Sequence, residues 1–139
     1  MEYDGRGSKV MVAESDRAVL EMLQIRLDVA GYHAISARNG ATAIEMLQHV
    51  RPSALVLELN LPDLDGFAVL EHLNLRMRAI PLPTLVVGRQ LAVADIKRAM
   101  NLGARDCMAK PFSGADVLDR LKRLICAPAP SPERATAWV

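Results

Sequence analysis

The sequence Ala-Leu-Val-Leu-Glu-Leu-Asn-Leu-Pro-Asp-Leu-Asp-Gly, residues 54–66, is the clearest indication of fold in this chain of 139 residues. It begins with a continuous apolar run, residues 54–57, which is typical of a parallel strand covered by helices on both faces. Glu58 stands where that strand should end, and loop residues then lead to a helical pattern that begins at Phe67. Because ligands of open α/β sheets bind at the carboxyl ends of the strands, Glu58 is the first candidate functional residue.

Four more short apolar segments have the length and composition of strands, and segments with helical spacing of apolar residues separate them. The five expected strands are residues 9–13, 33–36, 54–57, 84–87 and 106–109. Five strands that alternate with five helices predict an α/β fold with a doubly wound parallel sheet.

Local signals predict where several helices begin and end. Ser15 is the expected N-cap of the first helix, with Asp16 in its first turn, and Ser113 is the expected cap of the last helix. The third helix should span residues 67–77 and the fourth residues 91–102. A proline-containing segment should break the chain between them.

Composition is that of an ordinary folded protein of one domain, with 51% hydrophobic and 24% charged residues. The formal net charge of +1 gives no argument for binding nucleic acid or a membrane surface. We find no bilayer-spanning segment and no secretion signal, so we expect a cytoplasmic location. By composition, residues 1–8 form an N-terminal extension, residues 9–126 the domain, and residues 127–139 a Pro- and Ala-rich tail or linker.

Two motifs resemble those of the receiver domain of two-component response regulators. Residues 61–66, Leu-Pro-Asp-Leu-Asp-Gly, are similar to that family's loop after the third strand. Residues 103–106, Gly-Ala-Arg-Asp, followed by residues 110–112, Lys-Pro-Phe, resemble its second characteristic region. The resemblance implies a flavodoxin-like sheet of order 2-1-3-4-5. It also implies a signalling module that is not an enzyme, whose partner is a histidine kinase or another signalling protein.

The resemblance also implies roles for residues at the strand ends. Glu58 occupies the position of the aspartate that accepts a phosphoryl group, and Lys110 that of the supporting lysine. Glu14 matches the first of two acidic positions, but Ser15 replaces the second and Asp16 comes one residue late. Glutamate in place of aspartate moves the carboxylate outward by about 1 to 1.5 Å, an error that can cost roughly a hundredfold in an in-line attack.

Two further positions depart from the family pattern. Gly88 stands where the family has a threonine or serine hydroxyl, and Cys107 stands where many members have an aromatic residue that moves inward on activation. Both halves of the usual switch are therefore missing. Cys107 and Cys126 have no metal-ligand or redox spacing, so we expect free thiols.

Any magnesium site would consist of Glu14, Glu58 and the backbone carbonyl of Asn60. Mg²⁺ requires near-octahedral oxygen geometry, and this set has one formal charge fewer than the family's. We therefore expect Mg²⁺ binding to be weak or absent, and we expect no other cofactor.

The resemblance places a homodimer surface on the fourth helix, fifth strand and fifth helix. The charged residues expected on it are Lys97, Arg98, Asp106, Asp116, Asp119, Arg120 and Arg123. Their mixed signs would suit pairing across a two-fold axis, and the alternative is an ordinary solvated surface.

Three functions remain open from the sequence. The first is an atypical receiver that signals through protein contacts without phosphorylation, with Glu58 as a fixed negative charge or simply as the ion-pair partner of Lys110. The second is a phosphorelay receiver that accepts phosphate on Glu58 with weakly bound Mg²⁺. The third is a module that binds a small molecule or nucleotide, since Gly88 leaves room where a hydroxyl side chain would stand.

Overall fold

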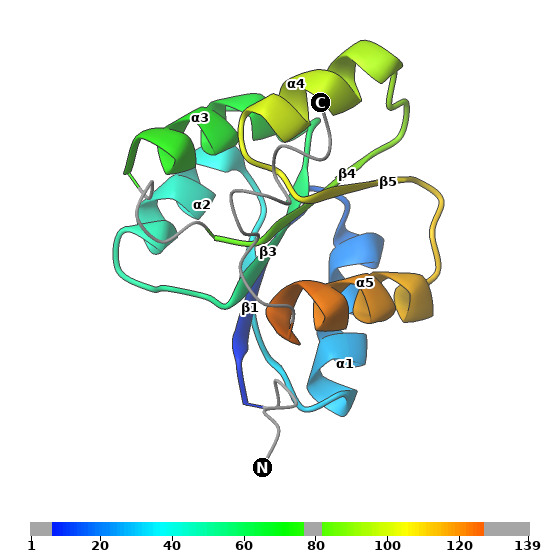
Figure 1. Ribbon diagram of the computed structural model, residues 1–139. Coiled ribbons are helices and arrows are strands. Elements are labelled where there is room, and N and C mark those ends of the chain that lie inside the picture. Colours follow the sequence, from blue (N-terminus) through cyan, green and yellow to red (C-terminus); the bar gives the residue numbers. More distant parts are fainter. Residues whose placement is uncertain (1–6, 77–81, 127–139) are drawn as a thin grey trace.

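A computed structural model describes residues 7–76 and 82–126 of the chain. Among these residues, five parallel strands form one sheet of order β2-β1-β3-β4-β5, and five helices connect them (Figure 1). The strands are β1 (Lys9–Ala13), β2 (His33–Ala37), β3 (Ala54–Glu58), β4 (Thr84–Gly88) and β5 (Asp106–Ala109). The helices are α1 (Arg17–Val29), α2 (Gly40–Leu47), α3 (Gly66–Arg76), α4 (Val93–Asn101) and α5 (Gly114–Cys126). The flavodoxin-like fold predicted from the sequence is confirmed.

Helices cover both faces of the sheet. α1 and α5 lie on one face, and α2, α3 and α4 lie on the other (Figure 1). Every residue of β3 and β4 is buried, and successive side chains of β3 enter opposite cores. Leu55 and Leu57 pack in the core under α2 and α3, whereas Val56 packs in the core under α1 and α5. This two-sided burial explains the continuous apolar run from which the strand was predicted.

One predicted helix cap is confirmed and one is wrong. Ser113 caps α5, where its Oγ accepts a hydrogen bond from a backbone N–H of the first turn at 3.1 Å. In α1 the N-cap is Asp16 rather than Ser15. Asp16 Oδ1 accepts hydrogen bonds from the N–H groups of Ala18 and Val19 at 3.0 and 3.3 Å. The charged cap suits the helix dipole, and it leaves Ser15 free for a different contact.

The predicted boundaries of α3 and α4 differ slightly from those observed. α4 begins at Val93, two residues later than predicted, because Leu91 packs against the core instead of continuing the helix. The predicted end of α3 at Met77 lies outside the described residues, as do residues 1–6, 78–81 and 127–139. No helix in the described part of the chain is long and apolar enough to cross a membrane.

The loop between β3 and α3 is held against the start of α2. Asp63, at a φ of 65°, accepts a hydrogen bond from the Gly40 N–H at 3.0 Å. Gly40 must lack a side chain, because a Cβ there would lie 1.9 Å from the carbonyl oxygen of Leu64. The loop that follows Glu58 is thus fixed on the sheet edge.

Candidate functional site

The candidate site lies at the carboxyl ends of three parallel strands. Glu14 follows β1, Glu58 ends β3, and Lys110 follows β5. Glu14 and Glu58 are buried, at 0% and 4% exposed, and Lys110 is a half-buried residue whose side chain is only 8% exposed. The structure therefore brings together the three charged residues that the sequence predicted at this edge.

Lys110 bridges the two carboxylates. Its Nζ donates a hydrogen bond to Glu58 Oε1 at 3.1 Å and another to Glu14 Oε1. Two carboxylates share one ammonium group, so the cluster carries one formal negative charge when all three groups are ionised. Since the cluster is buried, each of these charges depends on the others for compensation.

Ser15 binds the second oxygen of Glu58. Its backbone N–H and its Oγ both donate to Glu58 Oε2, at 2.8 and 2.6 Å. Burial alone would raise the pKa of Glu58, but the hydrogen bonds from Ser15 and Lys110 outweigh it and lower this pKa below its ordinary value. Glu58 is therefore a fixed carboxylate with both oxygens engaged. Sequence reasoning missed this contact because it assigned Ser15 to the helix cap.

Glu14 is in a less favourable environment. Its Oε2 is buried and has no hydrogen-bond partner among the described residues. Burial raises the pKa of Glu14, the hydrogen bond from Lys110 opposes this rise, and repulsion from Glu58 adds to it, with a net increase above the ordinary value. The neighbouring carboxylates thus have pKa values shifted in opposite directions.

With Lys110 bound to both glutamates, the cluster offers few free oxygens to a magnesium ion. Both oxygens of Glu58 and one oxygen of Glu14 already accept hydrogen bonds, which leaves Glu14 Oε2 as the one free carboxylate oxygen of the cluster. Mg²⁺ needs a near-octahedral set of oxygens. Within the described ranges, no group of three acidic, His or Cys side chains could hold a metal. Lys110 supplies the positive charge instead.

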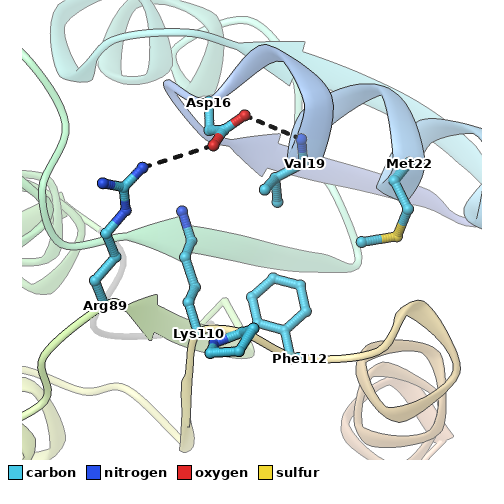
Figure 2. Close-up of a pocket in the computed structure, with 7 residues that line it drawn as sticks. Asp16, Val19, Met22, Arg89, Lys110 and Phe112 are labelled. Carbon is cyan, nitrogen blue, oxygen red and sulfur yellow. Dashed lines mark hydrogen bonds and ion pairs between the residues drawn. The ribbon is translucent and has the colours of Figure 1, made fainter.

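Asp16 does not join this cluster. One of its oxygens caps α1, and the other lies 3.6 Å from an Nη of Arg89 (Figure 2). The displacement by one residue along the first turn of the helix thus turns the Asp16 carboxylate toward the loop after β4. This carboxylate stabilises the helix and does not replace the missing second acidic residue.

A pocket of about 420 Å³ opens beside the cluster. Figure 2 shows Val19 and Met22 on its α1 side and Phe112 and Lys110 on the side of β5, with Asp16 at the top of the view and its ion-pair partner Arg89 on the left. The residues that line it are Asp16, Val19, Met22, Arg89, Lys110, Pro111 and Phe112.

The space predicted beside Gly88 is occupied, so that expectation was wrong. A Cβ atom at Gly88 would lie 2.8 Å from Leu91 Cδ2. Leu91 is half-buried and packs against the hydrophobic core. No local pattern identified Leu91, because its position depends on how the chain turns back after β4.

Cys107, at the position of the missing aromatic residue, is half-buried against the core. Burial raises the pKa of its thiol, and the adjacent Asp106 carboxylate raises it further. A thiol in this environment is mostly protonated at neutral pH and weakly nucleophilic.

Several charged residues of the predicted dimer surface have partners within the chain. Arg120 donates to both carboxylate oxygens of Asp106 at 2.8 Å, and Arg123 pairs with Asp119. Arg98 lies 3.5 Å from Glu71 and over the ring of Phe67. Lys97 and Asp116 are exposed residues of α4 and α5.

Comparison with known proteins agrees with this fold. The sequence model of the response regulator receiver domain matches residues 10–122. Over 117 residues, 84% of the chain, the sequence is 36% identical to the response regulator MprA of Mycobacterium ulcerans (strain Agy99). It is 35% identical to MprA of Mycobacterium avium over the same length. The chain spans about half the length of these relatives, with 50% of each covered.

Solved structures share the fold. The receiver domain of the Francisella response regulator 1452 has a TM-score of 0.77 and 23% identity, with 86% of this chain and 97% of that chain covered. A CheY-like receiver domain protein from Methanospirillum hungatei has a TM-score of 0.80 and 18% identity, with 86% and 94% covered. The family match, together with this sheet order, places the chain in a class of signalling modules. The chain belongs to the response regulator receiver domain family.

Proposed function

We propose that this receiver domain is atypical and signals through contacts with other proteins, without accepting a phosphoryl group. The observation that carries the proposal is the full engagement of Glu58. Lys110 binds one of its oxygens and Ser15 binds the other through two donors. In this proposal Glu58 is a permanent negative charge of the site and is not phosphorylated.

The chemistry of phosphoryl transfer supports this proposal. A nucleophilic carboxylate needs an oxygen free to attack in line with the leaving group, and the charge that develops on the phosphoryl oxygens needs a cation and hydrogen-bond donors. Hydrogen bonds from Ser15 and Lys110 hold both oxygens of Glu58, so attack by Glu58 would have to start from a carboxylate that these donors already stabilise. The longer glutamate side chain also misplaces the attacking oxygen by about 1 Å, a displacement that can cost roughly a hundredfold.

The cluster links three strands in one state. Glu14 is attached to β1, Glu58 to β3 and Lys110 to β5, so their mutual contacts tie the carboxyl ends of these strands together. In this proposal a signalling partner recognises this one state, and its binding is controlled by partner concentration rather than by phosphorylation. The histidine kinase or other signalling protein of the pathway is the expected class of partner.

Intact mass measured after incubation with Mg²⁺ and excess acetyl phosphate tests the proposal. We expect the wild-type protein to remain unmodified and the Glu58→Asp variant to gain one phosphoryl group, because its shorter side chain restores the family's acceptor. A phosphoryl group on the wild type that is absent from Glu58→Gln would overturn the proposal.

The second candidate function is a phosphorelay receiver that accepts phosphate on Glu58 with Mg²⁺. The observation that favours this function is Glu14 Oε2, a carboxylate oxygen that has no hydrogen-bond partner among the described residues and could coordinate a cation. It requires Lys110 to leave Glu14 as the ion enters. The same mass measurement separates the two functions, because only this one predicts Mg²⁺-dependent modification of the wild type.

A further inference from the structure

We infer that Leu91 slows phosphoryl acceptance at the candidate site, because its side chain packs against the position from which a receiver of this family would present a hydroxyl. This inference deepens the proposed function and rests on it. It assigns the loss of phosphoryl acceptance to two positions, Glu58 and Leu91, rather than to Glu58 alone.

Gly88 lies directly beside the charged cluster. In the sheet register, Glu58 is paired with Val87 on one side of β4, and Gly88 is paired with Ala109 on the other. The Lys110 N–H donates to the Gly88 carbonyl oxygen at 2.8 Å. A side chain at Gly88 would therefore stand between the carboxylate of one neighbouring strand and the lysine of the other.

Leu91 fills this position from three residues further along the chain. The turn after β4 brings its Cδ2 to 2.8 Å, and its Cγ to 3.5 Å, from the place where a Cβ of residue 88 would be. Asn60 Oδ1 lies 3.8 Å from the same place. Leu91 is half-buried and also packs against the core, which restricts the movement of its methyl groups.

A methyl group at this point has two consequences. It donates no hydrogen bond to a phosphoryl oxygen, and it adds apolar surface beside a group that carries charge, which disfavours binding of that group. It also crowds a threonine at position 88, which would require the end of the Leu91 side chain to shift. A smaller residue at position 91 would leave room for that threonine.

The test compares variants in the Glu58→Asp background, in which the acceptor carboxylate is restored. We would measure the rate of phosphoryl gain by intact mass with Mg²⁺ and acetyl phosphate. We expect Glu58→Asp/Gly88→Thr/Leu91→Ala to react roughly tenfold faster or more than Glu58→Asp/Gly88→Thr, because only the triple variant lets the hydroxyl donate to the phosphoryl oxygens.

The matched control is Glu58→Asp/Gly88→Thr/Leu102→Ala. Leu102 is likewise a half-buried leucine packed against the same core, so its truncation loosens the core without clearing position 88. The inference is overturned if the Leu91 variant gains phosphate no faster than the double variant, including the case in which neither reacts, or if the Leu102 variant is accelerated equally. Thermal unfolding of each variant confirms that rates are compared between folded proteins.

Including the wild-type protein in the same series distinguishes a failure of the proposed function from a failure of the inference about Leu91. Modification of Glu58 in the wild type overturns the proposed function, and the ratio of rates between the Leu91→Ala triple variant and its parent still decides the role of Leu91.

Discussion

The carboxyl edge of the sheet and the outer surface of α5 both contain cation and carboxylate pairs, but the two regions treat them differently. At the edge, the Lys110 side chain is 8% exposed and shares two buried glutamates. On α5, the side chains of Arg123 and Asp119 are 72% and 64% exposed. If one partner of the exposed pair on α5 is lost, water solvates the charge that remains. A charge left alone in the buried cluster has no such compensation. Burial therefore decides which charged pairs should contribute most to the stability of this domain.

The largest effect is expected from Lys110→Met. Removal of the ammonium group leaves Glu14 and Glu58 buried without a counter-ion, which should lower the free energy of unfolding by about 3 to 5 kcal/mol. Urea denaturation measures this loss. Lys97→Met, at an exposed position of α4, is the matched control and should change stability little. A loss below about 1 kcal/mol for Lys110→Met would show that the buried cluster behaves like a surface pair.

Ser15→Ala should have the next largest effect. It removes the hydroxyl that donates to Glu58 at 2.6 Å but keeps the backbone donor at 2.8 Å. A hydrogen bond to a charged group contributes about 1.5 to 3 kcal/mol, so we expect a loss near the lower end of this range. In the Glu58→Gln background the same substitution should cost less, because the acceptor is neutral. Equal losses in both backgrounds would contradict the assigned contact.

The sequence predicted the fold and the positions of the charged cluster, but not its contacts. The apolar run 54–57 indicated a strand buried on both faces, and parallel strands place their ends at one edge, so Glu58 and Lys110 were expected at the same edge of the sheet. Whether Ser15 caps the helix or binds a buried carboxylate depends on which groups lie close to it in three dimensions, and local sequence patterns do not show this. Leu91 was missed for the same reason, since only the path of the loop after β4 brings it over Gly88.

The pH dependence of stability should separate the two glutamates of the cluster. The pKa of Glu58 is lowered from the ordinary 4.5, so its ionised form favours folding, and this contribution is lost as the pH falls below 4.5 through the folded-state pKa. The pKa of Glu14 is raised above 4.5. Its ionisation therefore opposes folding, and the cost appears as the pH rises through the window above 4.5.

The two glutamine variants should therefore differ from wild type in opposite ways. Relative to wild type, Glu58→Gln should become less stable as the pH rises toward 4.5, and Glu14→Gln should gain stability as the pH rises above 4.5. Urea titrations over a pH series measure both differences. If both variants run parallel to wild type at every pH, the opposite shifts of the two pKa values are wrong.

The smallest effects are expected on the surface of α5 and β5. Arg120 pairs with both oxygens of Asp106, and the two side chains are 39% and 31% exposed. Water and salt screen such a pair, so Arg120→Ala should cost no more than about 1 kcal/mol. This cost should decrease at high salt. The loss caused by Lys110→Met should persist at high salt, because its partners are buried. Urea denaturation measures this cost. If Arg120→Ala lowers the free energy of unfolding by much more than about 1 kcal/mol, and equally at high salt, the Arg120 pair behaves like a buried pair and the distinction between the two regions fails.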